Sequence, residues 1–220
     1  MESVQPGKGS FERAKADMVR WIRRRVDDDR IADAFAAVPR EEFVPVDLWG
    51  QAYEHSALPI GEDQTISQPT MIAIMLQAAQ LKAADMVLDV GTGSGYQAAL
   101  LSHLVKTVIG VERIPTLVER ASAVFERLSY ADIVVHQAAE DVLGWPDDAP
   151  YDAILVAASS PSVPDSLVDQ LAVGGRLVIP VGEAFSQELV RVTKTSSRLR
   201  TESLGGCVFV PLIGRGAWNL

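Results

Sequence analysis

The sequence predicts an α/β fold with a doubly wound, largely parallel sheet, and three observations lead to this fold class. Short apolar runs of strand length alternate with runs of helical spacing over most of the chain. One apolar run, residues 87–90, leads directly into glycines at alternate positions, Gly91, Gly93 and Gly95. The chain has 220 residues, of which 48% are hydrophobic, and this is enough for one sizeable core. We therefore expect residues 1–220 to form a single domain.

Residues 1–81 are expected to form an N-terminal helical cap and an active-site segment. Apolar residues at helical spacing predict helices over residues 11–25, 30–38 and 71–81. The basic run at 20–25 would lie at the end of the first helix, where cations complement the helix dipole. Residues 43–61 lack sustained periodicity and are expected to be an irregular covering segment. Ser67 followed by Pro69 is typical of a helix start.

Residues 82–220 are expected to form the sheet and its flanking helices. Apolar runs predict five parallel strands, at residues 87–90, 107–111, 133–136, 151–158 and 176–181. Helical patterns lie between them, at 96–104, 115–128 and 164–171. Two further β-rich runs, 188–195 and 207–212, are expected to pair as an antiparallel hairpin. This layout is typical of the Rossmann-like fold of class I S-adenosylmethionine-dependent methyltransferases, whereas a dinucleotide dehydrogenase would need a sixth parallel strand and a catalytic domain.

Composition excludes several classes of function. The formal net charge is −9, so a nucleic-acid partner is not expected, because such binding usually needs a basic face. The apolar runs are far shorter than the ~20 residues of a membrane helix. No basic segment followed by an apolar one opens the chain, which leads us to expect a cytoplasmic protein. The single cysteine and three separated histidines predict neither an internal disulfide nor a metal site.

The glycine loop has the features of a nucleotide-cofactor site. A chain leaving a buried strand must turn sharply at Gly91, approach a ligand closely at Gly93 and enter a packed helix at Gly95. Thr92 lies within this turn and is expected beside the ligand. The loop alone does not distinguish NAD from S-adenosylmethionine.

Acidic residues around the loop favour S-adenosylmethionine as the cofactor. Glu112 ends the second strand, where a carboxylate can accept both ribose hydroxyls of an adenosine. Asp89 precedes the loop, where an acid suits the ammonium and sulfonium end of a methionine-type cofactor and would repel a pyrophosphate. A polar strand end is the alternative for Asp89. Glu140 and Asp141 follow the third strand, where they would meet the adenine amino group or belong to a solvated loop.

The chain resembles the protein-L-isoaspartate O-methyltransferase family over nearly its whole length. The resembling stretches are residues 38–45, 57–61, 64–69, the glycine loop, 112–114, 144–146 and 209–212. The most specific of them reads Gln64-Thr65-Ile66-Ser67-Gln68-Pro69. The resemblance implies that this serine block lies between cofactor and substrate, with Ser67 at the active site and with Gln64, Thr65, Ile66 and Arg113 beside the cofactor.

The resemblance also implies an activity, the transfer of a methyl group to the α-carboxylate of L-isoaspartyl residues in damaged proteins. The ester would collapse to a succinimide that reopens partly as normal aspartate, which repairs the protein. No general base is needed, because a carboxylate is already ionised at neutral pH, and catalysis would consist of alignment and exclusion of water. The expected partners are isoaspartyl-containing proteins or peptides, and the enzyme is expected to be a monomer.

Several positions depart from the family pattern and keep alternatives open. Ala139-Glu140-Asp141 stands where Gly-Asp-Gly is usual, and other residues are usual at His55, Asp63, Thr70 and Ala157. One alternative is a related methyltransferase that acts on a different peptide or small-molecule carboxylate. The other is a non-catalytic module that binds S-adenosylmethionine. Ser67 also has a structural alternative, as the N-cap of the helix that follows it.

Overall fold

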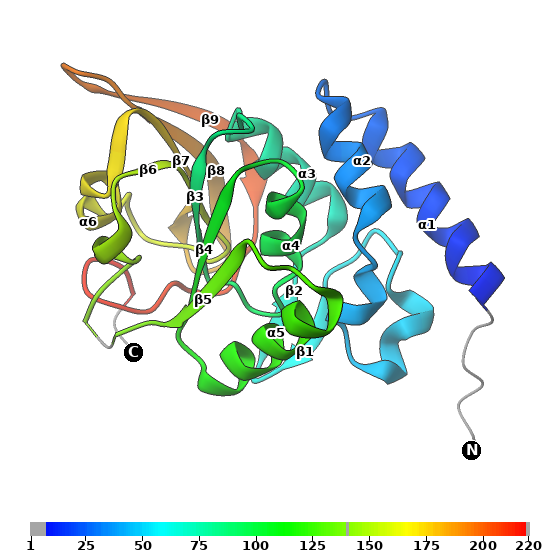
Figure 1. Cartoon of the computed structure of the whole chain (residues 1–220). Helices are drawn as coiled ribbons and strands as arrows, with labels where there is room; N and C mark the ends of the chain where they lie inside the picture. Colours follow the sequence, from blue (N-terminus) through cyan, green and yellow to red (C-terminus); the bar gives the residue numbers. More distant parts are fainter. Residues whose placement is uncertain (1–7, 140, 219–220) are drawn as a thin grey trace.

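The computed structural model describes residues 8–139 and 141–218 and centres on one seven-stranded sheet (Figure 1). The strand order is β5-β4-β3-β6-β7-β8-β9. The strands are β3 (Met86–Val90), β4 (Thr107–Glu112), β5 (Ile133–Gln137), β6 (Tyr151–Val156), β7 (Leu171–Glu183), β8 (Ser186–Lys194) and β9 (Leu199–Cys207). The pairings from β5 to β7 are parallel, whereas β8 and β9 are antiparallel to their neighbours. The predicted fold class is confirmed.

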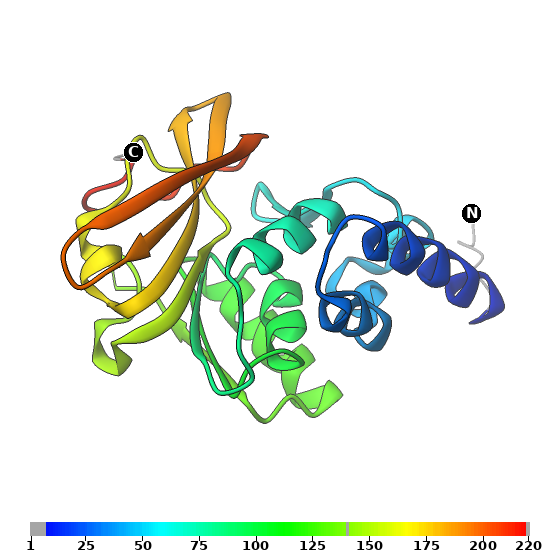
Figure 2. The ribbon, with the colours of Figure 1, turned by 90° about the horizontal axis from the view of Figure 1, so that it is seen from above.

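Helices cover both faces of the sheet. The α-helices are α1 (Lys8–Arg23), α2 (Asp29–Ala37), α3 (Pro69–Ala78), α4 (Tyr96–Ser102), α5 (Pro115–Leu128) and α6 (Asp165–Asp169). Short 3₁₀ helices are η1 (Arg40–Phe43), η2 (Val46–Gln51) and η3 (Pro146–Asp148). Figure 2 shows α1 and α2 at the opposite side of the molecule from β8 and β9. The predicted strands and helices of the core appear in the expected order, with ends shifted by a few residues.

The N-terminal cap shares its core with the sheet. Ile22 of α1 and Phe35 of α2 are fully buried in the same apolar cluster as Leu100 of α4 and Val87 of β3. A second apolar cluster contains Leu167 of α6 and those side chains of the central strands that do not belong to the first cluster. Burial of side chains on both faces explains why the central strands read as continuous apolar runs rather than as alternating patterns.

The second strand of the terminal hairpin was predicted at the wrong residues. Leu199–Cys207, not 207–212, pairs with β8, after a tight turn in which Thr195 Oγ1 accepts the N–H of Arg198 at 3.0 Å. The side chains of β9 are mostly polar and exposed, so their sequence resembles a loop. The apolar run 208–212 crosses the carboxyl edge of the sheet instead, because Ser159 pairs with Val210 and Leu212 through backbone hydrogen bonds of 2.7 Å.

Part of the segment predicted to be irregular forms a small hairpin. The strands β1 (Leu58–Gly61) and β2 (Gln64–Ile66) are antiparallel. Glu62 and Asp63 between them both have φ of 55°, as two-residue turns with positive φ at both positions require. This turn carries no glycine at its two central positions, so its sequence did not predict a hairpin.

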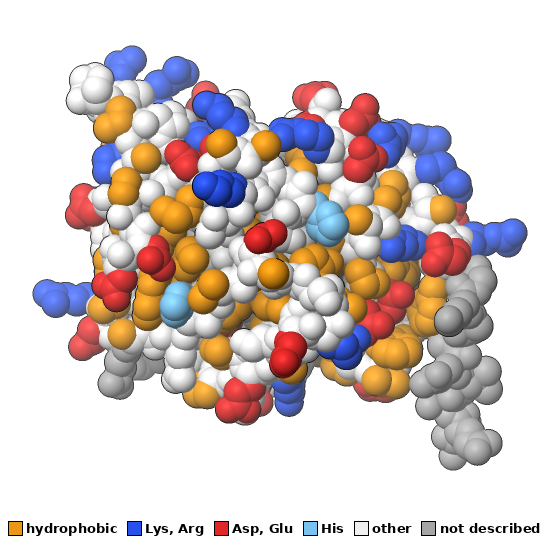
Figure 3. All heavy atoms as spheres, viewed as in Figure 1, with side chains coloured by type: hydrophobic (Ala, Val, Ile, Leu, Met, Phe, Trp, Pro, Cys, Tyr) orange, Lys and Arg blue, Asp and Glu red, His pale blue; other side chains and the backbone are white. Residues whose placement is uncertain are grey.

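The surface is consistent with the composition. Lys and Arg side chains are scattered among Asp and Glu on the face seen in Figure 3, without a continuous basic area. Within residues 8–139 and 141–218, no helix is long and apolar enough to cross a membrane.

Candidate active site

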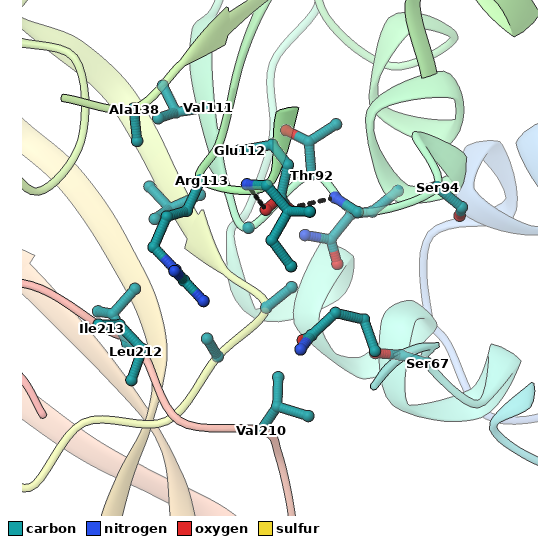
Figure 4. A pocket seen from close by; sticks show the side chains of 18 of the residues that line it. Ser67, Thr92, Ser94, Val111, Glu112, Arg113, Ala138, Val210, Leu212 and Ile213 are labelled. Atoms are coloured by element: carbon teal, nitrogen blue, oxygen red, sulfur yellow. Dashed lines mark hydrogen bonds between the residues drawn. The ribbon is translucent and has the colours of Figure 1, made fainter. Parts of the chain in front are cut away.

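A pocket lies at the carboxyl ends of β3, β4 and β6, where the strand order of the sheet reverses direction (Figure 4). Ligands of doubly wound sheets bind at this switch point, because the loops diverge there and leave a crevice. The described residues that line it are 64–67, 72, 90–94, 96–97, 111–114, 138–139, 142–144, 157–158 and 210–213. The pocket therefore contains most of the residues that the sequence predicted for the cofactor, together with segments that it did not predict.

The three glycines of the loop have different structural roles. Gly91 and Gly93 line the pocket with φ of 79° and 55°, a region that favours glycine. Gly95 does not line it, and a Cβ there would lie 2.6 Å from Cζ of Phe125 in α5. Gly95 therefore allows close packing of α4 on α5, which agrees with the expectation that the chain enters a packed helix at this residue. Its contribution to a cofactor site is indirect.

Glu112 holds the glycine loop in place with its carboxylate. One carboxylate oxygen accepts the N–H of Gly93 at 2.9 Å and the other accepts the N–H of Ile114 at 2.9 Å (Figure 4). Glu112 is buried and lines the pocket. Each carboxylate oxygen retains a second lone pair, so the group can accept hydrogen bonds from two neighbouring hydroxyls. Arg113, the next residue, lines the same pocket (Figure 4).

Asp89 lies behind the glycine loop and is not among the residues that line the pocket. It is fully buried, and one of its carboxylate oxygens accepts a 2.7 Å hydrogen bond from Nε2 of Gln97, while the other has no partner within the described residues. Burial raises the pKa of Asp89 to about 6. Gln97 does line the pocket, so this hydrogen bond links Asp89 to the pocket lining. Sequence reasoning had not singled out Gln97.

The serine block borders the pocket, and its serine does not cap the next helix. Gln64, Thr65, Ile66 and Ser67 all line the pocket. The helix α3 begins at Pro69 with Gln68 at its N-cap position and without a side-chain capping bond. The N-cap alternative for Ser67 is therefore wrong.

A buried arginine lies beneath this block. Arg40 is fully buried and donates from Nη2 to the carbonyl of Ser67 at 3.0 Å and to that of Ser56 at 3.3 Å. It also donates from Nη1 to the carbonyl of Ala52. Burial lowers the pKa of Arg40. Arg40 thus ties the serine block to residues 52–56, a link that no local pattern in the sequence indicates.

Of the two acids predicted on the adenine side, the structure describes only Asp141, and it does not line the pocket. Glu140 lies outside the described residues. Asp141 is exposed and lines a separate surface hollow instead. Apolar residues occupy this side of the pocket, including Ala138, Val142 and Leu143. The C-terminal segment 210–213 closes the opposite side (Figure 4).

A second hollow, which we call the side groove, adjoins the pocket and shares five of its residues. The shared residues are Thr65, Ser67, Ala157, Val210 and Pro211. The rest of the side groove is lined by His55, Ser56, Ala57, Gln68, Met71, Ala184, Phe185 and residues 206–209. Phe185 is 89% exposed at the turn between β7 and β8. Ser67 therefore lies where the two hollows meet, and a molecule in the groove can reach a molecule in the pocket.

Two of the positions that depart from the family pattern contact one tryptophan. Nε1 of Trp21 in α1 donates to Oγ1 of Thr70 at 3.2 Å, and the Trp21 ring centroid is 4.8 Å from that of His55. The guanidinium carbon of Arg25 is 3.3 Å from the Trp21 ring centroid on the same helix. Residues far apart in the sequence thus pack into one cluster at the edge of the side groove.

Comparisons with known proteins agree with this geometry. A profile of the family described as "Protein-L-isoaspartate(D-aspartate) O-methyltransferase (PCMT)" matches residues 13–217. The chain is 51% identical to the protein-L-isoaspartate O-methyltransferase of Roseiflexus sp. (strain RS-1) over 94% of each chain. It is 45% identical to protein-L-isoaspartate O-methyltransferase 1 of Syntrophobacter fumaroxidans, over 96% of this chain and 99% of the relative.

Solved structures of the same kind are also similar. One protein-L-isoaspartate O-methyltransferase superimposes with a TM-score of 0.83 at 27% identity, over 92% of this chain and 67% of that one. A Plasmodium falciparum protein in complex with S-adenosyl-L-homocysteine, assigned the same activity, superimposes with a TM-score of 0.76 at 27% identity, over 91% of this chain and 96% of that one.

Proposed function

The chain belongs to the protein-L-isoaspartate(D-aspartate) O-methyltransferase family, and from this premise we propose that it methylates the α-carboxylate of L-isoaspartyl residues in proteins, with S-adenosylmethionine as the methyl donor. The observation that carries the proposal is the position of Ser67, at the junction of the glycine-loop pocket and the side groove. A donor in the pocket and an acceptor in the groove would meet at this residue.

The residues of the pocket fit S-adenosylmethionine. Gly91 and Gly93 leave the loop surface uncrowded, because a Cβ on either would have no atom closer than 3.4 Å; the nearest atoms would be those of Ala157 for Gly91 and Cδ1 of Ile60 for Gly93. Glu112 has lone pairs for the two ribose hydroxyls. We propose further contacts from Gln64, Thr65, Ile66, Thr92 and Arg113. The charge of Asp89 behind the loop, which acts through Gln97, suits the positive end of the cofactor.

The chemistry that the cofactor supplies when bound is an electrophilic methyl group on a positively charged sulfur. The acceptor carboxylate is ionised at neutral pH, so one of its oxygens can attack without a general base. With the methyl donor held in the pocket, this oxygen would take the methyl group as the carbon–sulfur bond broke, the sulfur would keep the electron pair, and no proton would be transferred. Ser67 would donate its hydroxyl hydrogen to the other carboxylate oxygen and orient the attacking one.

An assay with paired peptides tests this proposal. The protein is incubated with methyl-labelled S-adenosylmethionine and either an isoaspartyl peptide or the same peptide with normal aspartate. We expect base-labile methyl ester on the isoaspartyl peptide only. Methylation of some other carboxylate with none on the isoaspartyl peptide would favour a related methyltransferase. Absence of turnover, with calorimetry showing no binding of S-adenosylmethionine or S-adenosylhomocysteine, would favour a non-catalytic module.

We also propose that the enzyme acts as a monomer. The described residues of a single chain already join the pocket and the side groove at Ser67, which supports this proposal. Sedimentation at micromolar concentration tests this, and an activity that rises more steeply than the enzyme concentration would contradict it.

A further inference from the structure

The charge of the side groove differs from that of the protein as a whole. The chain carries a formal net charge of −9. Nevertheless, none of the described residues that line the side groove is Asp, Glu, Lys or Arg, and only His55 and Cys207 have titratable side chains. An anionic peptide would therefore meet less repulsion in the side groove than on most of the surface.

A buried positive charge lies directly under one wall of this groove. Arg40 donates to the carbonyls of Ser56 and Ser67, which both line the groove, and within the described residues no carboxylate forms a salt bridge with it. Buried charges are usually paired, because the protein interior screens them weakly. The positive potential of Arg40 therefore extends into the groove rather than being cancelled by an internal partner.

His55 is held in a defined position at the same wall. Its ring packs against Trp21 with an angle of 41° between the ring planes, and its backbone carbonyl accepts a 2.8 Å hydrogen bond from Nε2 of Gln68. Trp21 is in turn fixed by its bond to Thr70 and by the guanidinium of Arg25. Partial burial, together with the charges of Arg25 and Arg40, lowers the pKa of His55, so the ring is neutral at neutral pH. This wall thus carries no negative charge that could offset Arg40.

On the basis of the proposed function, we propose that the side groove selects isoaspartyl sites whose neighbouring residues are acidic, and that His55 is a specificity-determining residue for this choice. The bound peptide presents the isoaspartyl carboxylate at Ser67 and its adjacent side chains to the wall formed by His55 and Ser56. An acidic side chain there is attracted by Arg40 and meets no carboxylate. Trp21 is a positioning residue, because it acts on the peptide only through the His55 ring.

The test compares two isoaspartyl peptides that differ at one adjacent residue, Glu in one and Lys in the other. We expect the wild-type protein to have the higher kcat/KM for the Glu peptide. The substitution His55→Asp adds a negative charge to the wall and should lower the Glu-to-Lys ratio of kcat/KM by roughly three- to ten-fold at low ionic strength, with a smaller change at high salt. The change should lie in KM, with kcat and the affinity for S-adenosylmethionine retained.

Two further variants serve as controls for this experiment. His55→Asn places a neutral side chain of similar size at the same position and should leave the ratio near the wild-type value. Trp21→Ala should raise KM for both peptides without changing kcat, because it frees the His55 ring without adding charge. His55 is exposed, so these substitutions at position 55 are compatible with folding, which a thermal melt checks.

Two results would overturn the inference. One is a wild-type protein that methylates both peptides equally well, and the other is a His55→Asp ratio equal to that of His55→Asn. If the proposed function itself is wrong, the result is different, because neither peptide is then methylated by the wild-type protein or by any variant. That result would contradict the inference as well.

Discussion

The two sides of the active site are built in different ways. Most of the proposed cofactor side lies within residues 89–114, a continuous stretch in which one strand end, the glycine loop and the next strand end are bound to each other by backbone and carboxylate hydrogen bonds. The acceptor side brings together Trp21, Arg40, His55, Ser67 and residues 206–211, which come from distant parts of the chain. Because the hydrogen bonds of the glycine loop are local, we expect substitutions on the acceptor side to leave them intact.

The largest expected effect tests whether the cofactor side depends on helix packing. Gly95→Ala would place a Cβ 2.6 Å from Phe125 at a φ of 91°, so we expect a loss of roughly 3 to 4 kcal/mol in the free energy of unfolding. Gly174→Ala is a matched control, because its φ is 86° and nothing lies within 4 Å of the added Cβ. It should cost about 1 kcal/mol. Urea denaturation of both variants measures the difference, and equal losses would contradict the packing role of Gly95.

The next effect should separate the two sides kinetically. Ser67→Ala removes the hydroxyl that we propose for orienting the acceptor carboxylate, so kcat should fall by about 100-fold, as for the loss of one transition-state donor. The dissociation constant for S-adenosylhomocysteine should change by less than about two-fold. Single-turnover kinetics and calorimetry provide the two readouts. A large loss of cofactor affinity with unchanged kcat would contradict the assignment of Ser67 to the acceptor side.

The complementary substitution is Glu112→Ala. It removes the acceptor for the N–H groups of Gly93 and Ile114 as well as the proposed ribose contact. We expect cofactor affinity to fall by about 2 kcal/mol, or roughly 30-fold in the dissociation constant. Glu119→Ala on the exposed face of α5 removes the same charge away from the site and is the control. If both variants bind the cofactor equally, the Glu112 assignment is wrong.

A smaller effect should appear in the pH dependence of stability through Asp89. Burial raises the pKa of Asp89 in the folded protein to about 6, above its ordinary value of about 4 in the unfolded chain. Between these two pH values the folded state still holds the proton, whereas the unfolded state has already lost it. The contribution of Asp89 to stability is therefore present below pH 4 and is lost as the pH rises through 6. Comparison with Asp89→Asn at pH 5 and pH 7 should show a wild-type loss of roughly 1 to 2 kcal/mol that the variant lacks. Parallel pH profiles would exclude this role.

The smallest effect concerns the hairpin that carries the serine block. Asp63 has a φ of 55°, where glycine is less strained, so Asp63→Gly should raise stability by about 0.5 kcal/mol without a change in kcat. Asp47→Gly is the control, because Asp47 lies in η2 and is not among the described residues with positive φ. It should destabilise the protein by up to about 1 kcal/mol. Destabilisation by Asp63→Gly would mean that the carboxylate has a structural role in the turn.

Sequence reasoning succeeded where the determinants are local. The parallel core was predictable because strands buried on both faces need continuous apolar runs, and the helices between them have their own periodicity. Gly91, Gly93 and Glu112 were predictable because the turn requires positive φ and the strand end places the carboxylate beside it. It failed at β9, an edge strand whose hydrogen bonds to β8, not its own polar side chains, make it a strand.

Patterns within short stretches of chain were therefore enough to predict the fold class, the glycine loop and the family. Burial of Asp89 behind the loop depends on the elements packed around it. Packing also brings residues 210–213 across the pocket, Arg40 to the serine block and Trp21 to His55, and these contacts join residues distant in sequence. Their formation depends on how the cap, the sheet and the C-terminal segment pack together, and no local propensity encodes that packing.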